Sequence, residues 1–66
     1  MTEIQYDDIA DAAYVTLGEE IKPGEATMQV DVALPDGVGG QVILDFDESG
    51  HLLGIEIIGA KALLRP

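Results

Sequence analysis

Turn-forming residues divide this chain into pieces of strand length, and this spacing constrains its fold more than any other feature. Glycine accepts positive φ and proline presets φ, so groups of these residues mark tight turns. Pieces this short, joined by short turns, leave no room for the long crossovers of a parallel sheet. We therefore expect four to five antiparallel strands in one small domain over residues 1–66. The turns fall at Pro23-Gly24, Pro35-Asp36-Gly37, Gly39-Gly40 and Ser49-Gly50.

The segments between the turns alternate apolar and polar residues with the period of two that a half-buried strand requires. Residues 41–47 and 52–58 are the clearest, and they predict a β-hairpin that turns at Asp47–Gly50. Asp47 would begin the turn and Gly50 would supply its left-handed residue. Further strands are expected over residues 3–6, 14–17 and 26–34.

Acidic residues after the first strand favour a short helix there. Asp7 or Asp8 can cap free backbone N–H groups, which predicts one or two helical turns. Lys61 and Arg65 suit the C-terminal end of another turn over residues 60–64. The expected fold class is α+β: a small antiparallel β-meander of four to five strands, with a short helical turn after strand 1 and another at the C-terminus.

The charge of the chain argues against several classes of partner. Thirteen acidic residues against three basic ones give a formal charge of −10, which would repel nucleic acid and anionic membranes. The chain has no cysteine and one histidine, so no disulfide, thiolate site or cofactor is expected. The N-terminus has no signal-peptide pattern and no apolar stretch approaches the length of a membrane span. We expect a cytoplasmic protein.

Small size favours self-association. A chain this short buries only about 60% of the surface that its unfolded form exposes, and such domains usually need a disulfide, a metal or another chain. The segment 52–58 is apolar on both sides, which suggests a second buried surface. That surface would be a homodimer contact or a partner site, or it would be covered by residues 60–64. The interface candidates are Leu52, Ile58, Leu63 and Leu64.

Residues 45–56 match the spacing of a calcium-binding EF-hand loop. The oxygen ligands would come from Asp45, Asp47, Ser49 and Glu56. An EF-hand loop lies between two helices, however, whereas both flanks here alternate with strand period. The hairpin turn is the preferred interpretation, and no metal or catalytic residue is assigned.

Two stretches of the chain are familiar when they occur together. They are Tyr6-Asp7-x-x-Ala10-Asp11-Ala12-x-Tyr14-Val15 and Val42-x-Leu44-Asp45-Phe46-Asp47-x-x-Gly50-x-Leu52-x-Gly54-Ile55-Glu56-Ile57. The chain resembles a family of very small, mainly bacterial domains of unknown function. The resemblance implies a compact α+β domain with an antiparallel sheet and no established enzymatic activity. Some relatives are thought to lie beside small toxin-like proteins, which implies a possible antitoxin role.

The residues of these motifs also have a physical interpretation. Asp7 and Asp11 are expected to fix the turn between the first two strands. Gly54, in the interior of a strand, marks a bulge or the close approach of another side chain such as Tyr14.

The sequence thus predicts a non-enzymatic protein-interaction module that self-associates, most simply as a dimer. An antitoxin-like neutraliser of a small basic protein is one alternative. A calcium-binding domain that uses residues 45–56 is the other.

Overall fold

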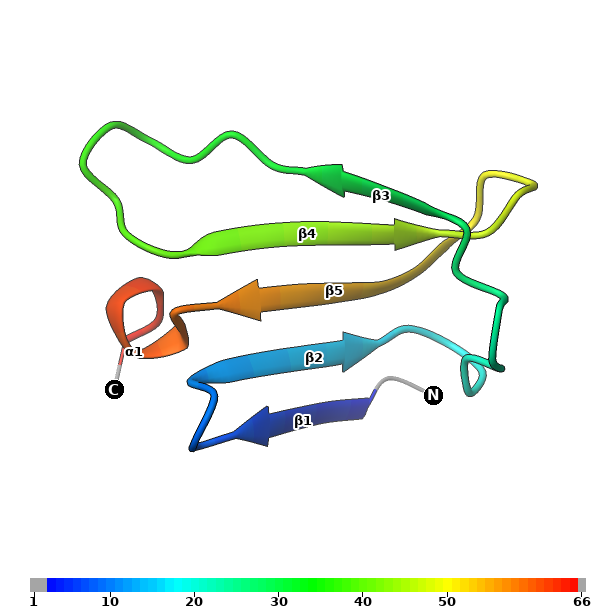
Figure 1. The fold of residues 1–66 in the computed structure, drawn as a ribbon, viewed down its shortest axis with the longest axis horizontal. Coiled ribbons are helices and arrows are strands. Elements are labelled where there is room, and N and C mark those ends of the chain that lie inside the picture. Colours follow the sequence, from blue (N-terminus) through cyan, green and yellow to red (C-terminus); the bar gives the residue numbers. More distant parts are fainter. Residues whose placement is uncertain (1–2, 66) are drawn as a thin grey trace.

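The computed structural model describes residues 3–65 and shows one antiparallel sheet followed by a short helix (Figure 1). The sheet has five strands in the order β1-β2-β5-β4-β3. The strands are β1 (Glu3–Asp7), β2 (Ala12–Thr16), β3 (Met28–Asp31), β4 (Gln41–Phe46) and β5 (Leu52–Ile58), and the helix α1 spans Ala60–Leu63.

The architecture is essentially all-β, so the predicted α+β class is wrong. Residues 8–11 form a tight turn in place of the expected helix. The Asp7 carboxylate accepts hydrogen bonds from the backbone N–H groups of Ile9 (3.0 Å) and Ala10 (3.1 Å). Asp11 then takes a left-handed φ of 52°, and Ala12 pairs with Asp7 across the hairpin. Acidic side chains accept hydrogen bonds from backbone N–H groups in such turns just as they do at helix ends. Composition alone therefore does not distinguish a tight turn from a short helix at this position.

The helical turn expected near the C-terminus is present as α1, which is four residues long. Among the described residues no helix has the length and apolar character needed to cross a membrane.

The predicted meander is also wrong, because β2 neighbours β5 and not β3. The segment 17–27 carries the chain from β2 past the ends of β5 and β4 to the opposite edge of the sheet (Figure 1). This order places β5, the most apolar strand, in the middle of the sheet. A central strand pairs on both sides and loses more apolar surface to its neighbours than an edge strand does.

The β4–β5 hairpin is confirmed, with its turn at Asp47–Gly50. The backbone N–H of Gly50 donates to the Asp47 carbonyl at 3.0 Å, and Gly50 has a φ of 89°. Asp45 pairs with Gly54 whereas Phe46 pairs with Leu52, so the register shifts at this point. Leu53 is the additional residue of a β-bulge.

The register aligns side chains in rows that cross the whole sheet. Directly opposed residues of antiparallel strands lie on the same face, and successive residues lie on opposite faces. One face, here called the apolar face, is made by the rows Ile4–Val15–Ile55–Leu44–Val30 and Tyr6–Ala13–Ile57–Val42, with Met28 opposite Phe46. The other, here called the polar face, is made by Glu3–Thr16–Gly54–Asp45–Gln29, Gln5–Tyr14–Glu56–Ile43–Asp31 and Asp7–Ala12–Ile58–Gln41.

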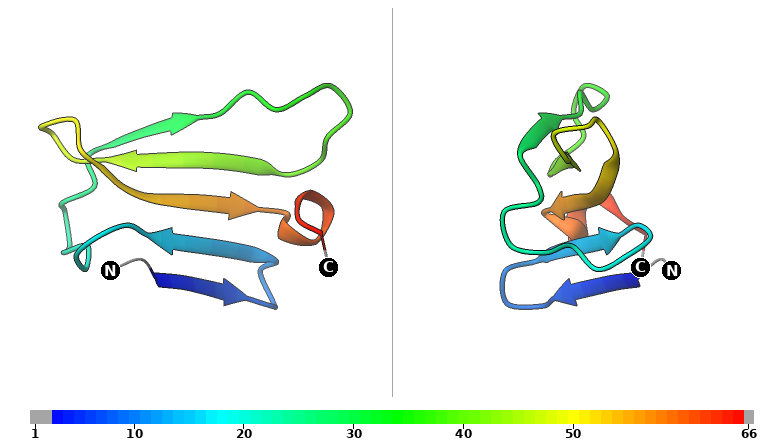
Figure 2. Two further views of the ribbon diagram at one scale, coloured as in Figure 1. Left: turned by 180° about the vertical axis from the view of Figure 1, so that it is seen from behind. Right: turned by 90° about the vertical axis from the view of Figure 1, so that its right-hand side faces the viewer.

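The sheet is a single layer. In the end-on view of Figure 2 the segment 17–27 bows out to one side, and α1 lies at one end of the strands on the other side. Neither segment forms a second layer over the apolar face. Among residues 3–65 the buried hydrophobic residues are only Ala13 and Ala60.

Candidate functional site

A hydrogen-bonded network on the polar face joins three strands around the carboxylate of Asp45. The Tyr14 hydroxyl from β2 donates to Oδ2 of Asp45 at 2.7 Å, and Nε2 of Gln29 from β3 donates to Oδ1 at 3.1 Å. Asp45 is only 6% exposed, and both of its oxygens are bonded. A buried carboxylate requires such donors, so this network fixes β2, β4 and β3 relative to one another.

Tyr14 reaches Asp45 by passing over Gly54 in the strand between them. A Cβ atom at residue 54 would stand 2.6 Å from Cζ of Tyr14, so the tyrosine ring or the strand would have to shift to admit it. Gly54 therefore has a steric role, because its lack of a side chain leaves the space that the Tyr14 ring occupies.

The surroundings of the Tyr14 hydroxyl hold its proton tightly. Desolvation by burial raises the pKa of Tyr14 well above its usual range, and the hydrogen bond to Asp45 and the charges of Asp45 and Glu56 raise it further. A phenol in this state is a hydrogen-bond donor and not a base or nucleophile at neutral pH.

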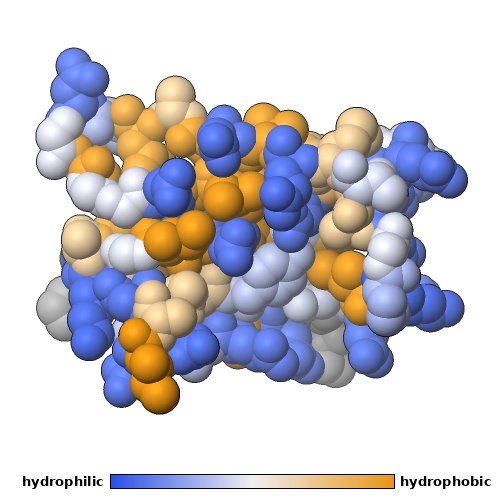
Figure 3. Space-filling view, in the orientation of Figure 1, coloured by the Kyte–Doolittle hydropathy of each residue, from blue (hydrophilic) through white to orange (hydrophobic). Residues whose placement is uncertain are grey.

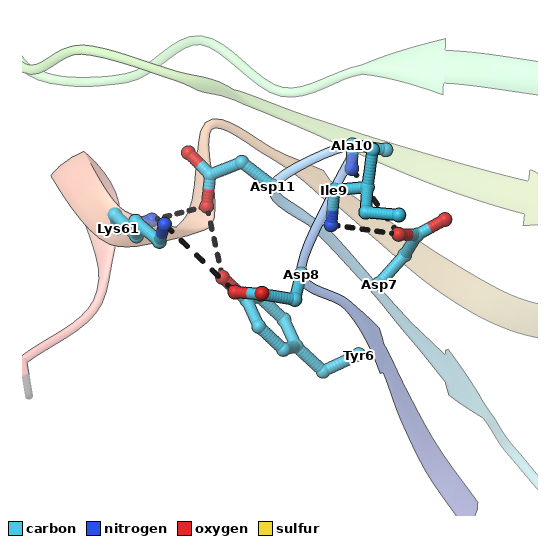
Figure 4. Close-up of polar contacts among 7 residues, drawn as sticks. All are labelled: Tyr6, Asp7, Asp8, Ile9, Ala10, Asp11 and Lys61. Atoms are coloured by element: carbon cyan, nitrogen blue, oxygen red, sulfur yellow. Dashed lines mark hydrogen bonds and ion pairs between the residues drawn. The ribbon is translucent and has the colours of Figure 1, made fainter.

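A second polar cluster connects the β1–β2 turn to α1 (Figure 4). Oδ1 of Asp11 accepts the backbone N–H of Lys61 at 2.9 Å and the hydroxyl of Tyr6 at 3.2 Å. The backbone carbonyl of Asp11 accepts the N–H groups of Gly59 (2.9 Å) and Ala60 (3.0 Å). One residue thus satisfies three donors at the start of a helix that lies about fifty positions later in the chain.

Nζ of Lys61 also lies 3.9 Å from Asp8, but both side chains are largely in water. Exposed ion pairs of this kind contribute little to stability.

The polar face is hollowed where the segment 17–27 passes beside it. An open hollow of about 820 Å³ is lined by Glu3, Gln5, Tyr14, Thr16, Gly18, Glu20 and Ile21. Figure 3 views this face and shows hydrophilic side chains interspersed with hydrophobic ones over the middle strands. The two glutamates make the hollow acidic.

The apolar face, in contrast, has no charged side chain in its rows and is partly open to solvent. Its edge residues are the most exposed: Ile4 (69%), Tyr6 (49%), Val30 (48%) and Met28 (45%). An apolar surface of this extent is typical of a site of protein contact. The alternation in the sequence predicts which side chains share this face but not their exposure, because exposure depends on what the rest of the chain covers.

The interface candidates named from the sequence lie apart from the centre of this face. Leu52 (37% exposed) lies at the start of β5 beside the turn, and Leu64 (46%) follows α1. Ile58 belongs to the polar face, between Ala12 and Gln41. Leu63 is the last residue of α1, near Gly40. The apolar face is centred instead on Ile55 and Ile57, and Leu52, which pairs with Phe46, lies at its end.

The four oxygen-bearing residues of the EF-hand pattern do not converge. Asp45 is engaged with Tyr14 and Gln29, whereas Asp47 bonds the N–H groups of Ser49 and His51 (both 2.9 Å) inside the turn. Glu56 lies opposite Ile43 and Tyr14, in a different row from Asp45. Within residues 3–65 no three histidine, aspartate or glutamate side chains are grouped so that they could hold a metal ion.

The turn residues named from the sequence have identifiable positions. Asp7 caps the β1–β2 turn, Asp11 occupies its left-handed position, and Asp47 and Gly50 form the β4–β5 turn. The carboxylate of Asp47 also lies 3.0 Å from Nδ1 of His51. Its pKa is lowered, first by the backbone N–H of His51, then by the His51 side chain and the N–H of Ser49, while partial desolvation opposes this.

Comparison with known proteins places the chain in a family. Searches of curated proteins and of solved structures give no match. The family model described as "Protein of unknown function (DUF2283)" matches residues 3–61, which is most of the chain. The protein therefore belongs to this family of small domains of unknown function, in agreement with the family resemblance of its sequence.

Proposed function

We propose that this protein is a non-enzymatic protein-interaction module that works in a self-associated form. The observation that carries the proposal is the lack of a covered core: the buried hydrophobic residues from 3 to 65 are two alanines, and none of the large side chains there is fully buried. Full burial of one large apolar side chain contributes about 1.5–3 kcal/mol, so an isolated sheet of this kind forgoes most of its available stabilisation. Contact with another protein surface supplies it.

The polar groups support a structural role for the polar face. The Asp45 carboxylate on this face is engaged by two donors of the same chain, Tyr14 and Gln29. The Tyr14 hydroxyl, the polar group with the most strongly raised pKa, is held as a donor. These residues stabilise the sheet, which leaves the apolar face as the surface for contact with another protein.

Light scattering coupled to size-exclusion chromatography tests the proposal directly. We expect a molar mass of at least twice the 7.0 kDa of one chain. A folded, stable species of 7.0 kDa at all concentrations would contradict self-association.

A second candidate function is neutralisation of a small basic protein, in the manner of an antitoxin. It is favoured by the formal charge of −10 and by the position of Glu3 and Glu20 around the open hollow. Charge complementarity accelerates such associations and makes them sensitive to salt. Co-purification with a small basic protein encoded beside the gene, weakened by Glu3→Lys and Glu20→Lys together, would support this function. An isolated gene without such a neighbour would contradict it.

A further inference from the structure

We propose that the apolar face is the surface through which two copies of this chain associate, stacked face to face as a two-layer β-sandwich. The inference rests on the proposed function, because it names the surface and the occupant through which self-association takes place.

The accessible surface of the chain is too large for a free-standing domain of its size. It amounts to 4960 Å² for a mass of 7.0 kDa, whereas a compact monomer of that mass exposes about 4,000 Å². The excess of about 900 Å² is close to the ~800 Å² that each partner contributes to a standard protein interface. One additional contact of ordinary size would therefore give this chain the surface of a normal globular domain.

The shape of the chain leads to the same conclusion. Its radius of gyration is 12.3 Å, compared with about 11 Å for a compact domain of 66 residues. The shortest of its three dimensions is 18 Å against a longest of 33 Å. Sheets in a β-sandwich pack about 10 Å apart, so a second sheet on the apolar face would complete the missing layer.

The distribution of charge allows a second copy to be that layer. A chain of charge −10 should repel its own copy, but the acidic residues of the strands all lie in rows of the polar face. Stacking the apolar faces turns these carboxylates outward on opposite sides of the sandwich. They are then separated by more than the screening length of about 8 Å at physiological ionic strength.

Pairing of exposed edge strands is the main competing arrangement. The edges β1 and β3 could extend the sheet into a second copy, as exposed edges often do. Such pairing would leave both apolar faces in water, since it adds strands beside the sheet and not above it. The apolar face carries several of the exposed large apolar side chains, and face-to-face packing is the arrangement that covers them: Ile4, Tyr6, Met28 and Val30.

The topology also defines the centre of the interface. A contact between identical surfaces is related by a two-fold axis. Because β5 is the middle strand, Ile55 and Ile57 lie at the centre of the apolar face. Ile43 and Ile58 lie on the polar face and would point away from the partner.

These four isoleucines provide a test in the native sequence. A sample is mixed from chains with ¹³C-labelled isoleucine methyl groups and unlabelled chains, and isotope-filtered NOE spectra report contacts between copies. We expect intermolecular NOEs at the methyl groups of Ile55 and Ile57 and none at Ile43. Intermolecular NOEs confined to Ile4 on the edge strand β1 or to Ile43 and Ile58, or a dimeric sample with none at Ile55 and Ile57, would overturn the proposed surface while leaving self-association intact.

A pair of variants on neighbouring residues of β4 gives the second measurement. Leu44→Lys places a charge in the central row of the apolar face, whereas Ile43→Lys places the same charge on the polar face. We expect Leu44→Lys to raise the dissociation constant of the dimer at least a hundred-fold and Ile43→Lys to change it less than a few-fold. Equal effects would refute the proposed surface, and a native chain that is monomeric throughout would also refute the proposed function.

Discussion

At the scale of single residues, the polar face depends on a tyrosine that lies across a glycine. The Tyr14 ring occupies the space above Gly54, and its hydroxyl ends on Asp45 at 2.7 Å. Glycine in a strand interior normally weakens the strand, because it has a large entropy in the unfolded chain and no side chain to pack. Here that cost is offset by the hydrogen bond which the open space permits.

The first prediction concerns this close approach. Gly54→Ala should lower the free energy of unfolding by about 1–3 kcal/mol, the usual effect of overpacking, because the new Cβ would stand 2.6 Å from Cζ of Tyr14. Urea denaturation measures the loss. In a Tyr14→Ala background the same substitution should cost far less, since the two residues are coupled through one contact.

Gly39→Ala is the matched control for this substitution. A Cβ at residue 39 would meet Cβ of Ala62 at 3.6 Å, which is ordinary van der Waals contact. An equal loss for Gly54→Ala with and without the Tyr14 ring would contradict the steric explanation.

The second prediction concerns the alkaline stability of the fold. Because the folded-state pKa of Tyr14 is raised, the unfolded chain loses this proton first as pH increases. The stabilisation is therefore complete below the ordinary tyrosine pKa of about 10 and declines as pH rises beyond it. The free energy of unfolding of the native protein should fall more steeply above pH ~10 than that of Tyr14→Phe. Parallel curves for the two proteins would show that Tyr14 is not the responsible group.

At the scale of elements, α1 is held by a turn that is remote in sequence. A four-residue helix has almost no stability of its own, because the first turn of a helix is costly to form. Asp11 compensates by accepting the N–H groups of Gly59, Ala60 and Lys61 through its carbonyl and its carboxylate. The hairpin β1–β2 and the C-terminal segment therefore form one unit.

The third prediction follows from this dependence. Asp11→Ala should increase hydrogen exchange at the Lys61 amide about ten-fold, the equivalent of the ~1–1.5 kcal/mol that such a hydrogen bond contributes. Asp11→Asn should have a smaller effect, because asparagine tolerates the left-handed conformation and keeps an acceptor oxygen. Mass spectrometry of exchanged peptides from the C-terminal segment gives the measurement. Identical exchange in the two variants would argue against the carboxylate contact.

At the scale of the whole molecule, stability and assembly are linked. A protein whose folded form gains an interface is stabilised by mass action, so its melting temperature increases with its own concentration. We expect scanning calorimetry to show a rise of several degrees over a hundred-fold increase in protein concentration, since a small domain shifts by ~4–8 °C per kcal/mol. A melting temperature independent of concentration would indicate a monomer that is stable alone.

Much of this sheet could be read from the sequence because its determinants are local. Strand alternation and the turn residues predicted the 41–58 hairpin, its turn at Asp47–Gly50 and the shared side of Val42, Leu44 and Phe46. Periodicity and turn chemistry are properties of neighbouring residues, so no tertiary information was needed.

Every feature that joins residues distant in the chain became visible only in the tertiary structure. Sequence could not place β2 beside β5, because that pairing depends on the path of the long connection over residues 17–27, which no local pattern determines. Nor could it distinguish a capped turn from a short helix after β1, since Asp7 bonds backbone N–H groups in the same way in both. Above all, alternation identifies which side chains share a face but not whether anything covers that face. Only the assembled sheet shows that no second layer from residues 3–65 lies over the apolar face (Figure 2), because burial is decided by the whole chain and not by any segment of it.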